Sequence, residues 1–462
     1  MEPSLHDRPQ YDLPRIVVMQ KTFFSSGASR SIAFRLEKLQ ALEQEIIRRS
    51  DDLIAVLAED LRKPALEAYV SEVYFVLKEI RLFRRKLSQW SRPKRVGNPF
   101  YFFPARSEIR RDPFGCVLIT APWNYPVQLS LSPLIAAIAA GNCVLLKPSE
   151  LAPATAILLS EVIRTVFSPA HVTVVQGGPE VGKTLLKQPF DFWFFTGNER
   201  IGRLYAEAAA KNLAPAILEL GGKCPCLLAE DADLDLSVER ILTAKFFNAG
   251  QTCIAPDFVL IPESLQEVFV EKAKNVLQEM YGRPAIPDLA SIVNHENYQR
   301  LLQLIPEGAI QVGSDDPATC RLAPRLLRNS TWNSPEMQEE IFGPVLPIIG
   351  YDKLEDALSE IAARPSPLAL YAFSRSRKTL ERIATSVRSG SVCFNDALKQ
   401  ATNLNLPFGG VGSSGMGRYR GRAGFEAFTY QRAVTMRYFL KDIFSVKPPY
   451  GSLLKTIRKF LK

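Results

Sequence analysis

Hydrophobic residues follow two spacings in this chain, and from about residue 115 onward the two alternate. Short apolar or β-branched runs, typical of buried strands, take turns with stretches that carry an apolar residue at every third or fourth position, typical of helices. Strands that alternate with helices form βαβ units, which predict a parallel sheet with a ligand crevice at the carboxyl ends of its strands. We expect strands at 116–120, 143–147, 172–176, 192–195 and 216–220, and helices at 126–140, 153–167, 179–188 and 199–210.

The rest of the chain shows the same patterns in longer blocks. Helical spacing over 33–61 and 65–90 predicts two long helices before the sheet, whereas residues 1–25 show no clear pattern. A second series of strands and helices covers about 226–395. Residues 93–113 predict an extended excursion, and 429–438 predict a strand.

The longest apolar stretch, residues 127–146, is interrupted by Gln128, Pro133 and Asn142. A membrane-spanning helix needs about 20 predominantly apolar residues. This stretch therefore predicts a buried helix followed by a strand.

The composition is that of a globular protein, with 47% apolar and 23% charged residues among 462. That length corresponds to roughly three domain-sized units. The net charge of +9 is concentrated around residues 78–95 and 441–462. Solvated helix faces explain such runs, and because no nucleic-acid-binding signature accompanies them, no nucleic acid is expected as a partner.

The C-terminal tail, residues 441–462, combines this positive charge with apolar residues at helical spacing. This predicts a short basic amphipathic helix that can contact a membrane surface peripherally and is too short to cross a bilayer. The apolar positions are Leu453, Leu454, Ile457, Phe460 and Leu461, and the basic positions between them are Lys455, Arg458, Lys459 and Lys462.

Cysteine usage favours a reducing, cytoplasmic location. The seven cysteines are scattered and odd in number, and the N-terminus shows no apolar signal segment. Cys224 and Cys226 form a C-x-C without a second pair, and the chain has three histidines, so no metal site is expected.

Three side chains of different chemistry lie within well-spaced motifs. Cys253 follows Gly-Gln-Thr, Glu219 precedes Leu-Gly-Gly-Lys, and Asn124 stands in Pro-Trp-Asn-Tyr-Pro. A thiol can attack a carbonyl, an amide can stabilise the resulting oxyanion, and a carboxylate can activate water. Each residue alone is weak evidence, since a lone cysteine is more often a small buried hydrophobe.

Two glycine-containing turns follow predicted strands. Residues 177–184 satisfy G-x-x-x-x-G-K-[ST], but Pro179 removes a backbone N–H from a loop that should offer N–H groups to phosphate. A nucleotide hydrolase is therefore disfavoured against an ordinary turn. Residues 195–202 could bring a helix N-terminus to dinucleotide phosphates. Lys147 and Glu150, at another strand end, could hold a ribose.

These motifs occur together and in the same order in aldehyde dehydrogenases, which the chain resembles from about residue 33 to residue 439. Further matching segments are Glu-Glu-Ile-Phe-Gly-Pro-Val at 339–345 and Pro-Phe-Gly-Gly-Val-Gly-Ser-Ser-Gly-Met-Gly at 407–417. The short N-terminus, Lys-Pro-Ser-Glu at 147–150 and the basic tail resemble the class-3, fatty-aldehyde branch.

The resemblance implies a role for each candidate residue. Cys253 would form a thiohemiacetal and then a thioester, Asn124 would stabilise the oxyanion, and Glu219 would activate the hydrolytic water. The implied cofactor contacts are Trp123, Lys147, Glu150, Gly178, Gly182, Phe195, Thr196, Gly197, Gly202, Leu220, Glu340 and Phe342. Because Glu150 would accept from a free 2′-hydroxyl and repel a 2′-phosphate, NAD should be preferred, with NADP also tolerated.

The implied fold is α/β, with a Rossmann-type parallel-sheet cofactor domain, an α/β catalytic domain and a small β oligomerisation unit that suggests a homodimer. The expected boundaries are 1–92 and 109–218 for the NAD(P)-binding domain, 219–412 for the catalytic domain, and 93–108 and 413–440 for the oligomerisation unit.

Three other functions stay open at this point. A CoA-acylating dehydrogenase or acyl reductase would use a thiol in place of water, and Glu219 argues for water. A cofactor-free cysteine hydrolase would need a histidine partner that no motif near Cys253 supplies. A catalytically silent membrane-surface protein would not need Cys253, Glu219 and Asn124 together. The expected substrate is a medium- or long-chain aldehyde or another apolar one, including apocarotenoid-type and aromatic aldehydes.

Overall fold

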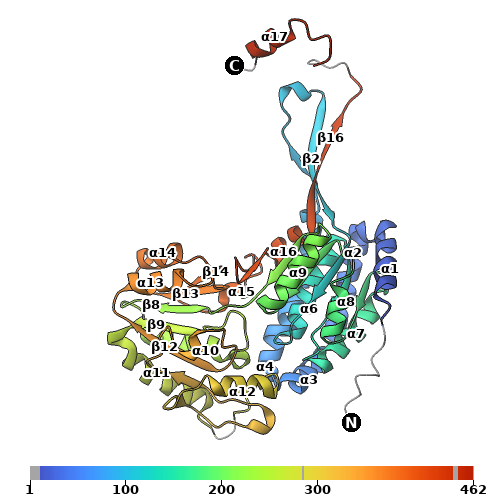
Figure 1. Cartoon of the computed structure of the whole chain (residues 1–462). Helices are drawn as coiled ribbons and strands as arrows, with labels where there is room; N and C mark the ends of the chain where they lie inside the picture. The colour runs from blue at the N-terminus through green and yellow to red at the C-terminus, as the bar shows by residue number, and fades with distance from the viewer. Residues whose placement is uncertain (1–10, 284–285, 441–445, 461–462) are drawn as a thin grey trace.

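Three β-sheets organise the chain in the computed structural model, which describes residues 11–283, 286–440 and 446–460. Two larger sheets form the two lobes of the body, and a three-stranded sheet forms an arm that projects from it (Figure 1). The α/β fold class expected from the alternation of strands and helices is confirmed.

The first lobe contains a six-stranded sheet in the order β15-β7-β6-β3-β4-β5. Its five longer strands are mutually parallel, and β15 runs antiparallel to β7. All five predicted strands are present, with ends that differ from the prediction by at most two residues. Their bounds are Cys116–Thr120 for β3, Cys143–Lys147 for β4, Val172–Val174 for β5, Phe192–Thr196 for β6, Ala216–Glu219 for β7 and Gly415–Met416 for β15.

The helices of this lobe begin where the sequence supplies a start signal. Proline occupies the first turn of α6, α7 and α8, where its missing N–H costs no hydrogen bond. Asn198 caps α9 by accepting from the backbone N–H of Ile201 at 3.0 Å. The helices are α6 (Pro126–Ala140), α7 (Pro153–Val166), α8 (Pro179–Leu185) and α9 (Glu199–Lys211).

Helix α6 is buried along its whole length and is followed directly by β4, as expected for the longest apolar stretch. Gly141 ends the helix with φ 99°, a left-handed value that glycine adopts at little cost. Within the described ranges, the structure contains no helix of the length and apolar character that a bilayer crossing requires.

The N-terminal helices differ from the prediction in two ways. The expected helix over 33–61 is two helices, because the chain leaves helical geometry at Arg49. Of the segment without a clear pattern, residues 1–10 lie outside the described residues, and Leu13–Ser25 forms helix α1. Its buried face includes Gln20, whose amide donates to the carbonyl of Val144 at 2.7 Å. A polar residue on the buried face hides the amphipathic spacing.

The remaining N-terminal helices pack against α6 and α7 of the first lobe. They are the 3-10 turn Ala28–Arg30, α2 (Ile32–Arg48), α3 (Ser50–Leu61), α4 (Ala65–Ala68), a π-helical turn at Tyr69–Val73, and α5 (Tyr74–Trp90). The predicted helix over 65–90 is thus helical throughout, with a π turn near its start.

The second lobe is built on a seven-stranded sheet in the order β10-β11-β12-β9-β8-β13-β14, parallel except for the pair β10 and β11. The strands are β8 (Pro225–Leu228), β9 (Phe258–Pro262), β10 (Ile310–Gln311), β11 (Arg325–Leu327), β12 (Val345–Tyr351), β13 (Ala369–Phe373) and β14 (Ser391–Phe394). The accompanying helices are α10 (Leu234–Phe246), α11 (Glu263–Tyr281), α12 (His295–Gln303), α13 (Leu354–Ala362), α14 (Arg377–Ser386) and α15 (Lys399–Thr402).

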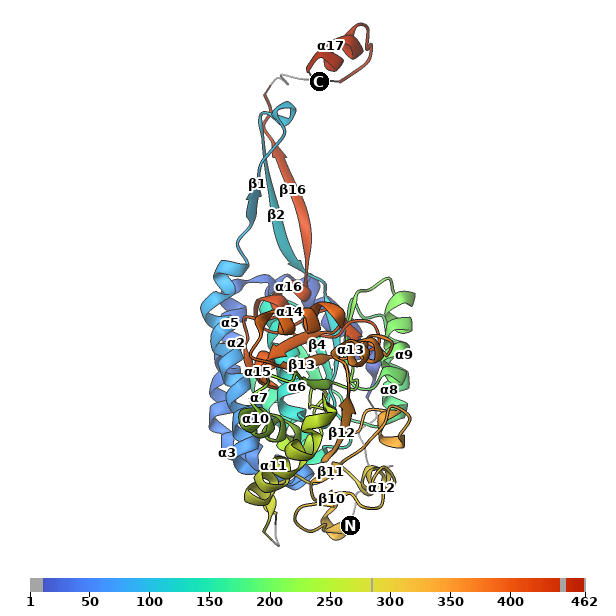
Figure 2. The same ribbon diagram turned by 90° about the vertical axis from the view of Figure 1, so that its left-hand side faces the viewer.

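The arm joins two segments that are far apart in the sequence. Strand β2 (Ala105–Pro113) pairs antiparallel with β16 (Thr429–Arg437) along its full length, and β1 (Lys94–Val96) pairs with the other side of β2. Helix α16 (Gly421–Ala427) lies at the base (Figure 2). The predicted excursion and the predicted strand near residue 429 are both confirmed.

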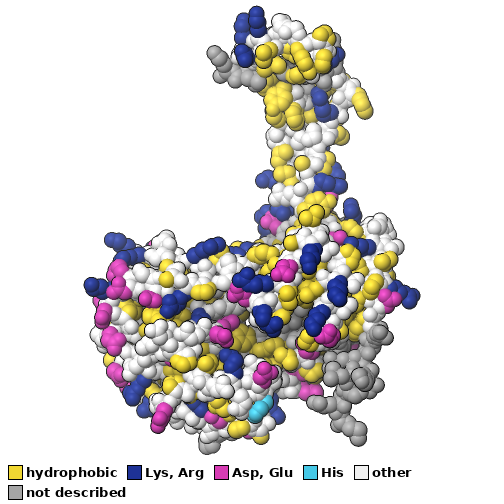
Figure 3. Space-filling view, in the orientation of Figure 1, with side chains coloured by type: hydrophobic (Ala, Val, Ile, Leu, Met, Phe, Trp, Pro, Cys, Tyr) yellow, Lys and Arg dark blue, Asp and Glu magenta, His cyan; other side chains and the backbone are white. Residues whose placement is uncertain are grey.

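The outer end of the arm is rich in exposed hydrophobic side chains (Figure 3). They include Phe100, Tyr101 and Phe102 of a 3-10 turn and the following Phe103. Beyond the arm lies α17 (Leu453–Phe460), which presents exposed Lys455, Arg458 and Lys459. Of the expected tail, residues 441–445 and 461–462 lie outside the described residues.

One buried ionisable group links the packing of the first lobe to pH. His171 is 1% exposed, and its ring packs against Phe23, Phe34 and Phe167 at centroid distances of 5.2 to 5.5 Å. Burial lowers the pKa of His171 to about 4 from its usual 6.5, and the charge of Lys38 adds to this effect.

We predict that His171→Leu loses less stability on acidification than the wild type. Below about pH 6.5 the unfolded chain binds a proton at His171 that the folded chain does not bind until about pH 4, so the folded state is progressively destabilised. The difference should reach about 2 kcal/mol by about pH 5. Urea midpoints measured at neutral and acidic pH test this, and parallel pH profiles for the two proteins would contradict it.

Candidate active site

The loop that precedes Cys253 lies against the segment 339–345, and the two backbones are too close to leave room for a side chain between them. Asn248 and Ala249 have φ of 53° and 52°, and Gly250 has φ of 74°, so three successive residues adopt left-handed geometry. A Cβ atom at Gly250 would overlap the carbonyl oxygen of Gly343. Glycine is therefore required here, and it lets the loop before Cys253 lie against the segment that contains Glu340 and Phe342.

Asn124 is held by that same cysteine loop. It is 3% exposed, and its side-chain amide donates to the carbonyl of Gln251 at 3.0 Å. Its backbone carbonyl accepts from the Asn248 amide at 3.0 Å and from the Lys63 ammonium at 2.9 Å. Since a side-chain amide has two N–H bonds, one remains for a developing oxyanion.

A buried ion pair anchors this arrangement from the side of the N-terminal helices. Lys63 and Glu72 are both fully buried, with Nζ 2.5 Å from Oε1. The second oxygen of Glu72 accepts from the first backbone N–H groups of α6, those of Val127 and Gln128, at 2.9 and 3.0 Å. Both ends of the segment that carries Asn124 are therefore fixed by one carboxylate and its lysine.

Glu219 ends β7 in a site that leaves its carboxyl group without a partner. It is 2% exposed, and neither carboxyl oxygen has a hydrogen-bond partner among the described residues. One oxygen packs against Gly409, where a Cβ would lie 3.0 Å away. Burial raises the pKa of Glu219 well above its usual value, and the charges of Arg420 and Arg418 oppose that shift.

The thiol of Cys253 and the carboxyl of Glu340 belong to the same electrostatic cluster. Burial raises the pKa of Cys253 to about 12, the carboxyl groups of Glu340 and Glu219 add to the effect, and Arg420 opposes it. Burial also raises the pKa of Glu340 to about 8. Burial thus favours the neutral forms of Cys253 and Glu340 and shifts Glu219 in the same direction, and a nearby positive charge favours the ionised form of each.

The residues expected to bind a cofactor divide into two groups. In the first lobe, Lys147 donates to Glu150 at 2.9 Å at the carboxyl end of β4. Gly178 and Gly182 border open space at the start of α8, since a Cβ at either would meet no atom within 4 Å. Thr196 is buried at the end of β6 with its hydroxyl unpartnered among the described residues.

Close packing explains the other predicted positions of the first lobe. A Cβ at Gly197 would lie 2.6 Å from the ring of Phe195, and one at Gly202 would lie 2.6 Å from Leu220. These glycines let the start of α9 lie close to the ends of β6 and β7.

The second group lies beside Cys253. The rings of Trp123 and Phe342 meet edge to face with centroids 5.5 Å apart, and Phe342 has a left-handed φ of 52°. The carboxyl group of Glu340 packs so closely on Gly221 that a Cβ there would overlap it. The structure therefore brings Trp123, Phe342 and Glu340 to the cysteine, while Lys147 and Glu150 lie at another strand end.

The structure argues against a phosphate-binding loop at residues 177–184. Lys183, which would have to reach a phosphate, is exposed and pairs with Glu180 at 2.6 Å on the helix surface. Thr184 donates its hydroxyl to the carbonyl of Glu180. The segment is an ordinary turn into α8.

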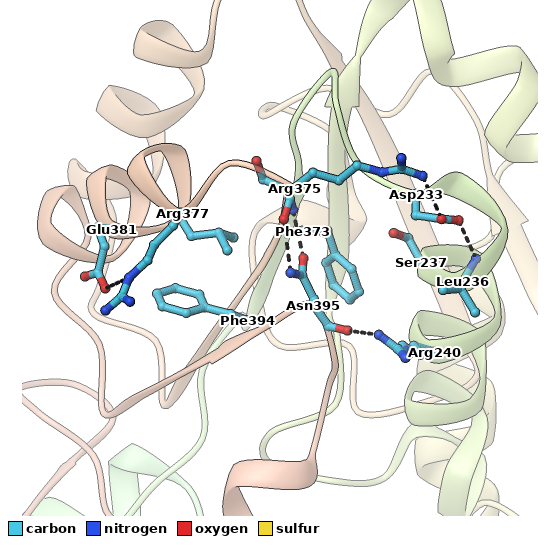
Figure 4. A pocket seen from close by; sticks show the side chains of 12 residues that line it. Asp233, Leu236, Ser237, Arg240, Phe373, Arg375, Arg377, Glu381, Phe394 and Asn395 are labelled. Atoms are coloured by element: carbon cyan, nitrogen blue, oxygen red, sulfur yellow. Dashed lines mark hydrogen bonds and ion pairs between the residues drawn. The ribbon is translucent and has the colours of Figure 1, made fainter.

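A cavity of about 570 Å³ lies at the carboxyl ends of β13 and β14 (Figure 4). Cys253 lies at the opposite, amino-terminal side of this sheet, five residues before β9. None of the candidate residues lines the cavity, and its arginines are already engaged. Arg375 pairs with Asp233, Arg377 with Glu381, and Arg240 donates to the carbonyl of Asn395. It is not the reaction site.

Several residues at the site carry no sequence signal. Lys63, Glu72 and Arg420 stand outside every motif, and they reach the site only through packing. The described part of the chain contains no group of three His, Cys, Asp or Glu residues arranged to hold a metal ion. All seven cysteines are free thiols.

Comparison with known proteins identifies the family, because the model of the aldehyde dehydrogenase family matches residues 9–434. The chain belongs to the aldehyde dehydrogenase family. It is 40% identical to the 4,4′-diaponeurosporen-aldehyde dehydrogenase of Staphylococcus aureus, over 96% of this chain and 97% of that protein. It is 41% identical to aldehyde dehydrogenase family 3 member B1 of Rattus norvegicus, over 93% of each chain.

Solved structures agree with the sequence comparison. A substrate-bound Staphylococcus aureus AldH superposes with a TM-score of 0.95 at 39% identity, over 98% of this chain and 100% of that one. An indole-3-acetaldehyde dehydrogenase in complex with NAD⁺ gives 0.84 at 25% identity, over 92% and 89%. The resemblance to the class-3 branch is confirmed, and the protein is an aldehyde dehydrogenase that uses NAD(P) to oxidise aldehydes.

We predict that Lys63→Met destabilises the enzyme by about 3 to 5 kcal/mol, because it leaves the Glu72 carboxylate buried without its partner. It should also lower kcat, because Asn124 loses one of its anchors. Urea unfolding and steady-state kinetics measure both effects.

Lys183→Met is the matched control, since it removes an exposed ion pair worth at most about 1 kcal/mol. The double variant Lys63→Met/Glu72→Gln should recover part of the lost stability. Equal stability of Lys63→Met and Lys183→Met would refute the assigned role of the buried pair.

Proposed function

We propose that Cys253 is the nucleophile, that Asn124 and the Cys253 backbone N–H stabilise the oxyanion, and that Glu219 activates the hydrolytic water. The proposal is supported mainly by the proximity of these groups to one another. Asn124 is hydrogen-bonded to the loop of Cys253, and the Glu219 carboxyl lies close enough to raise the pKa of the Cys253 thiol.

The reaction follows from the chemistry of these groups. The Cys253 thiolate attacks the aldehyde carbon, and the new alkoxide accepts from the free N–H of Asn124 and the N–H of Cys253. A bound NAD would supply the hydride acceptor for this carbon, and loss of the hydride would leave a thioester on Cys253. Glu219 takes a proton from water as the water oxygen attacks the thioester carbon, the C–S bond breaks to release the carboxylic acid and the Cys253 thiolate, and Glu219 then returns its proton to solvent.

The elevated pKa of Glu219 suits this role. A carboxylate whose pKa is raised by burial binds a proton more tightly, and is therefore a stronger base, than an ordinary surface glutamate. Its burial at the end of β7 and its lack of hydrogen-bond partners in the described structure both support this assignment.

The residues present are suited to a dinucleotide. Lys147 and Glu150 offer an ammonium and a carboxylate for the hydroxyls of the adenosine ribose. Gly178 and Gly182 leave room at the start of α8, and the unpartnered hydroxyl of Thr196 is a free donor and acceptor. Phe195, Gly197, Gly202 and Leu220 would shape the same surface.

Trp123, Glu340 and Phe342 would hold the nicotinamide end, beside the thiol. Glu150 would repel a 2′-phosphate, so NAD is the preferred cofactor and NADP a poorer one.

The substrate we propose is an apolar aldehyde of medium or long chain. The relative from Staphylococcus aureus is named for an extended apolar aldehyde. In this chain an aromatic ring, that of Phe408, lies beside the proposed reaction centre. Phe408 directly precedes Gly409, which packs against the Glu219 carboxyl group, and its ring contacts Arg420.

Two alternative enzymes receive less support. A CoA-acylating enzyme would not need Glu219 as a base. A cofactor-free cysteine hydrolase needs a histidine, but His171 is packed among phenylalanines and His295 contacts Gln299 on the helix α12. His6 lies outside the described residues.

We predict that purified enzyme forms NADH with hexanal, decanal and hexadecanal, faster with the longer chains, and forms NADPH more slowly. Cys253→Ala should abolish the activity while leaving the fold intact, because it removes the nucleophile. Absorbance at 340 nm measures turnover, and Cys393→Ala, another partly exposed cysteine, is the control. An absolute requirement for CoA would favour the acylating alternative, and no reduced cofactor from any aldehyde would reject the proposal.

We propose the domain boundaries given by the resemblance and, with them, a homodimer built by the arm. Strand β16 forms an edge of the three-stranded sheet, and seven of its nine residues are exposed. Exposed edges of this length invite pairing with another chain. We also propose that the C-terminal tail contacts a membrane, because the basic amphipathic helix α17 suits an anionic membrane surface.

We predict a dimeric mass by light scattering and binding of the full chain to anionic vesicles. Lys455→Glu/Lys459→Glu should weaken vesicle binding by more than about tenfold, since each basic residue near an anionic surface contributes about 1 kcal/mol. The mass should not change. Lys274→Glu/Lys378→Glu, on the body, is the matched control. A monomeric mass would exclude the dimer, and equal binding by the two double variants would exclude the tail contact.

A further inference from the structure

Arg420 is a buried cation in the wall of the active site that no motif identifies. It is 5% exposed and directly precedes α16. Its guanidinium lies over the rings of Phe408 and Phe75, at 4.2 and 4.8 Å from their centroids, and 5.6 Å from that of Tyr419. The backbone of Arg420 has φ of 75°, which is uncommon for a residue other than glycine.

The guanidinium is only partly satisfied. One Nη donates to the backbone carbonyl of Ala401, while Nε is buried without a hydrogen-bond partner among the described residues. Aromatic faces attract a guanidinium without using its N–H donors. The aromatic rings thus hold a positive charge in a dry site and leave donors unused.

The charged groups that face Arg420 come from two other elements. Glu79 of α5 accepts from the backbone N–H of Gly421, and Glu219 ends β7. The charge of Arg420 also opposes the rise that burial causes in the pKa of the neighbouring Tyr419. Arg418 acts on Glu219 as well, but Arg420 is the cation that acts on both Glu219 and Cys253.

During turnover, negative charge forms close to the Arg420 guanidinium. Cys253 must become a thiolate, and Glu219 must become a carboxylate before it can take a proton from water. Glu219 is buried and Cys253 is only partly exposed, so both lie in a low-dielectric environment, and Glu340 adds further negative charge beside the thiol whenever it ionises. In such a medium an unscreened positive charge has a large effect on the charged forms of its neighbours.

We propose that Arg420 is a positioning residue whose guanidinium stabilises the negative charge that forms on the Cys253 sulfur and the Glu219 carboxylate. This inference rests on the proposed roles of Cys253 and Glu219. It agrees with the direction in which Arg420 moves both groups, since it lowers the pKa of each.

The test compares two neutral variants with one that keeps the charge. Arg420→Met removes the charge and keeps an unbranched apolar stem, Arg420→Gln keeps a donor for Ala401, and Arg420→Lys keeps the charge. The rate at which iodoacetamide alkylates Cys253 is measured from about pH 7 to about pH 9, where the rate follows the thiolate fraction. Mass spectrometry of the Cys253 peptide separates this thiol from the other six.

We expect alkylation of Arg420→Met and Arg420→Gln to be about tenfold slower than wild type at each pH, which corresponds to a rise of about one unit in the thiol pKa. Arg420→Lys should remain within about threefold of wild type, because the charge is kept. Arg418→Met, the matched control, should alkylate at the wild-type rate. The pH profile of kcat/KM should move to higher pH in the neutral variants alone.

Wild-type alkylation rates in a folded Arg420→Met or Arg420→Gln would overturn the inference, and two neutral variants guard against the failure of one to fold. Equal slowing in Arg420→Lys and Arg420→Met would also overturn it, because that pattern reports packing and not charge. Failure of the wild type to form NADH would reject the proposed function instead, independently of these alkylation rates.

Discussion

The buried pair of Lys63 and Glu72 is the constraint on which the geometry of the active site depends. Two opposite charges without solvent contact hold together three parts of the chain: the N-terminal helices, the start of α6 and the segment that carries Asn124. Because Asn124 is in turn bonded to Gln251, the position of the cysteine loop is set by the same network. Removing one partner would leave the other as an uncompensated buried charge.

The rest of the site is organised by burial of ionisable groups. Glu219, Glu340 and Cys253 are all shifted toward their neutral forms, and burial is the largest cause for each. A site of this kind is inert until a cation, a base or a reacting ligand changes the balance. The aromatic enclosure of Arg420 and the ammonium groups of Lys223 and Lys245 near Glu340 supply the opposing charge. Catalysis in this fold is therefore a matter of placing few charges accurately in a dry interior.

The sequence predicts those parts of the fold that depend on local patterns. The strands of the first sheet and helix α6 are recognisable because their apolar runs are continuous and end at proline or glycine. Helix α1 is not, since Gln20 occupies its buried face to satisfy a carbonyl of the sheet. The motifs around Cys253, Glu219 and Asn124 predict the candidate site because each is a contiguous segment. Lys63 and Arg420 could not be predicted, because in the sequence nothing distinguishes them from ordinary surface lysines and arginines. Only the folded structure shows that they are buried at the site.

A rapid-mixing experiment with Glu219→Gln shows whether Cys253 carries a thioester that is hydrolysed by water activated by Glu219. Enzyme at substrate concentration is mixed with decanal and NAD, and the NADH formed in the first turnover is measured together with the acylated Cys253 peptide. We expect about one NADH per active site, after which turnover nearly stops and the thioester stays on Cys253. Steady turnover at the wild-type rate without accumulation of the thioester would contradict it.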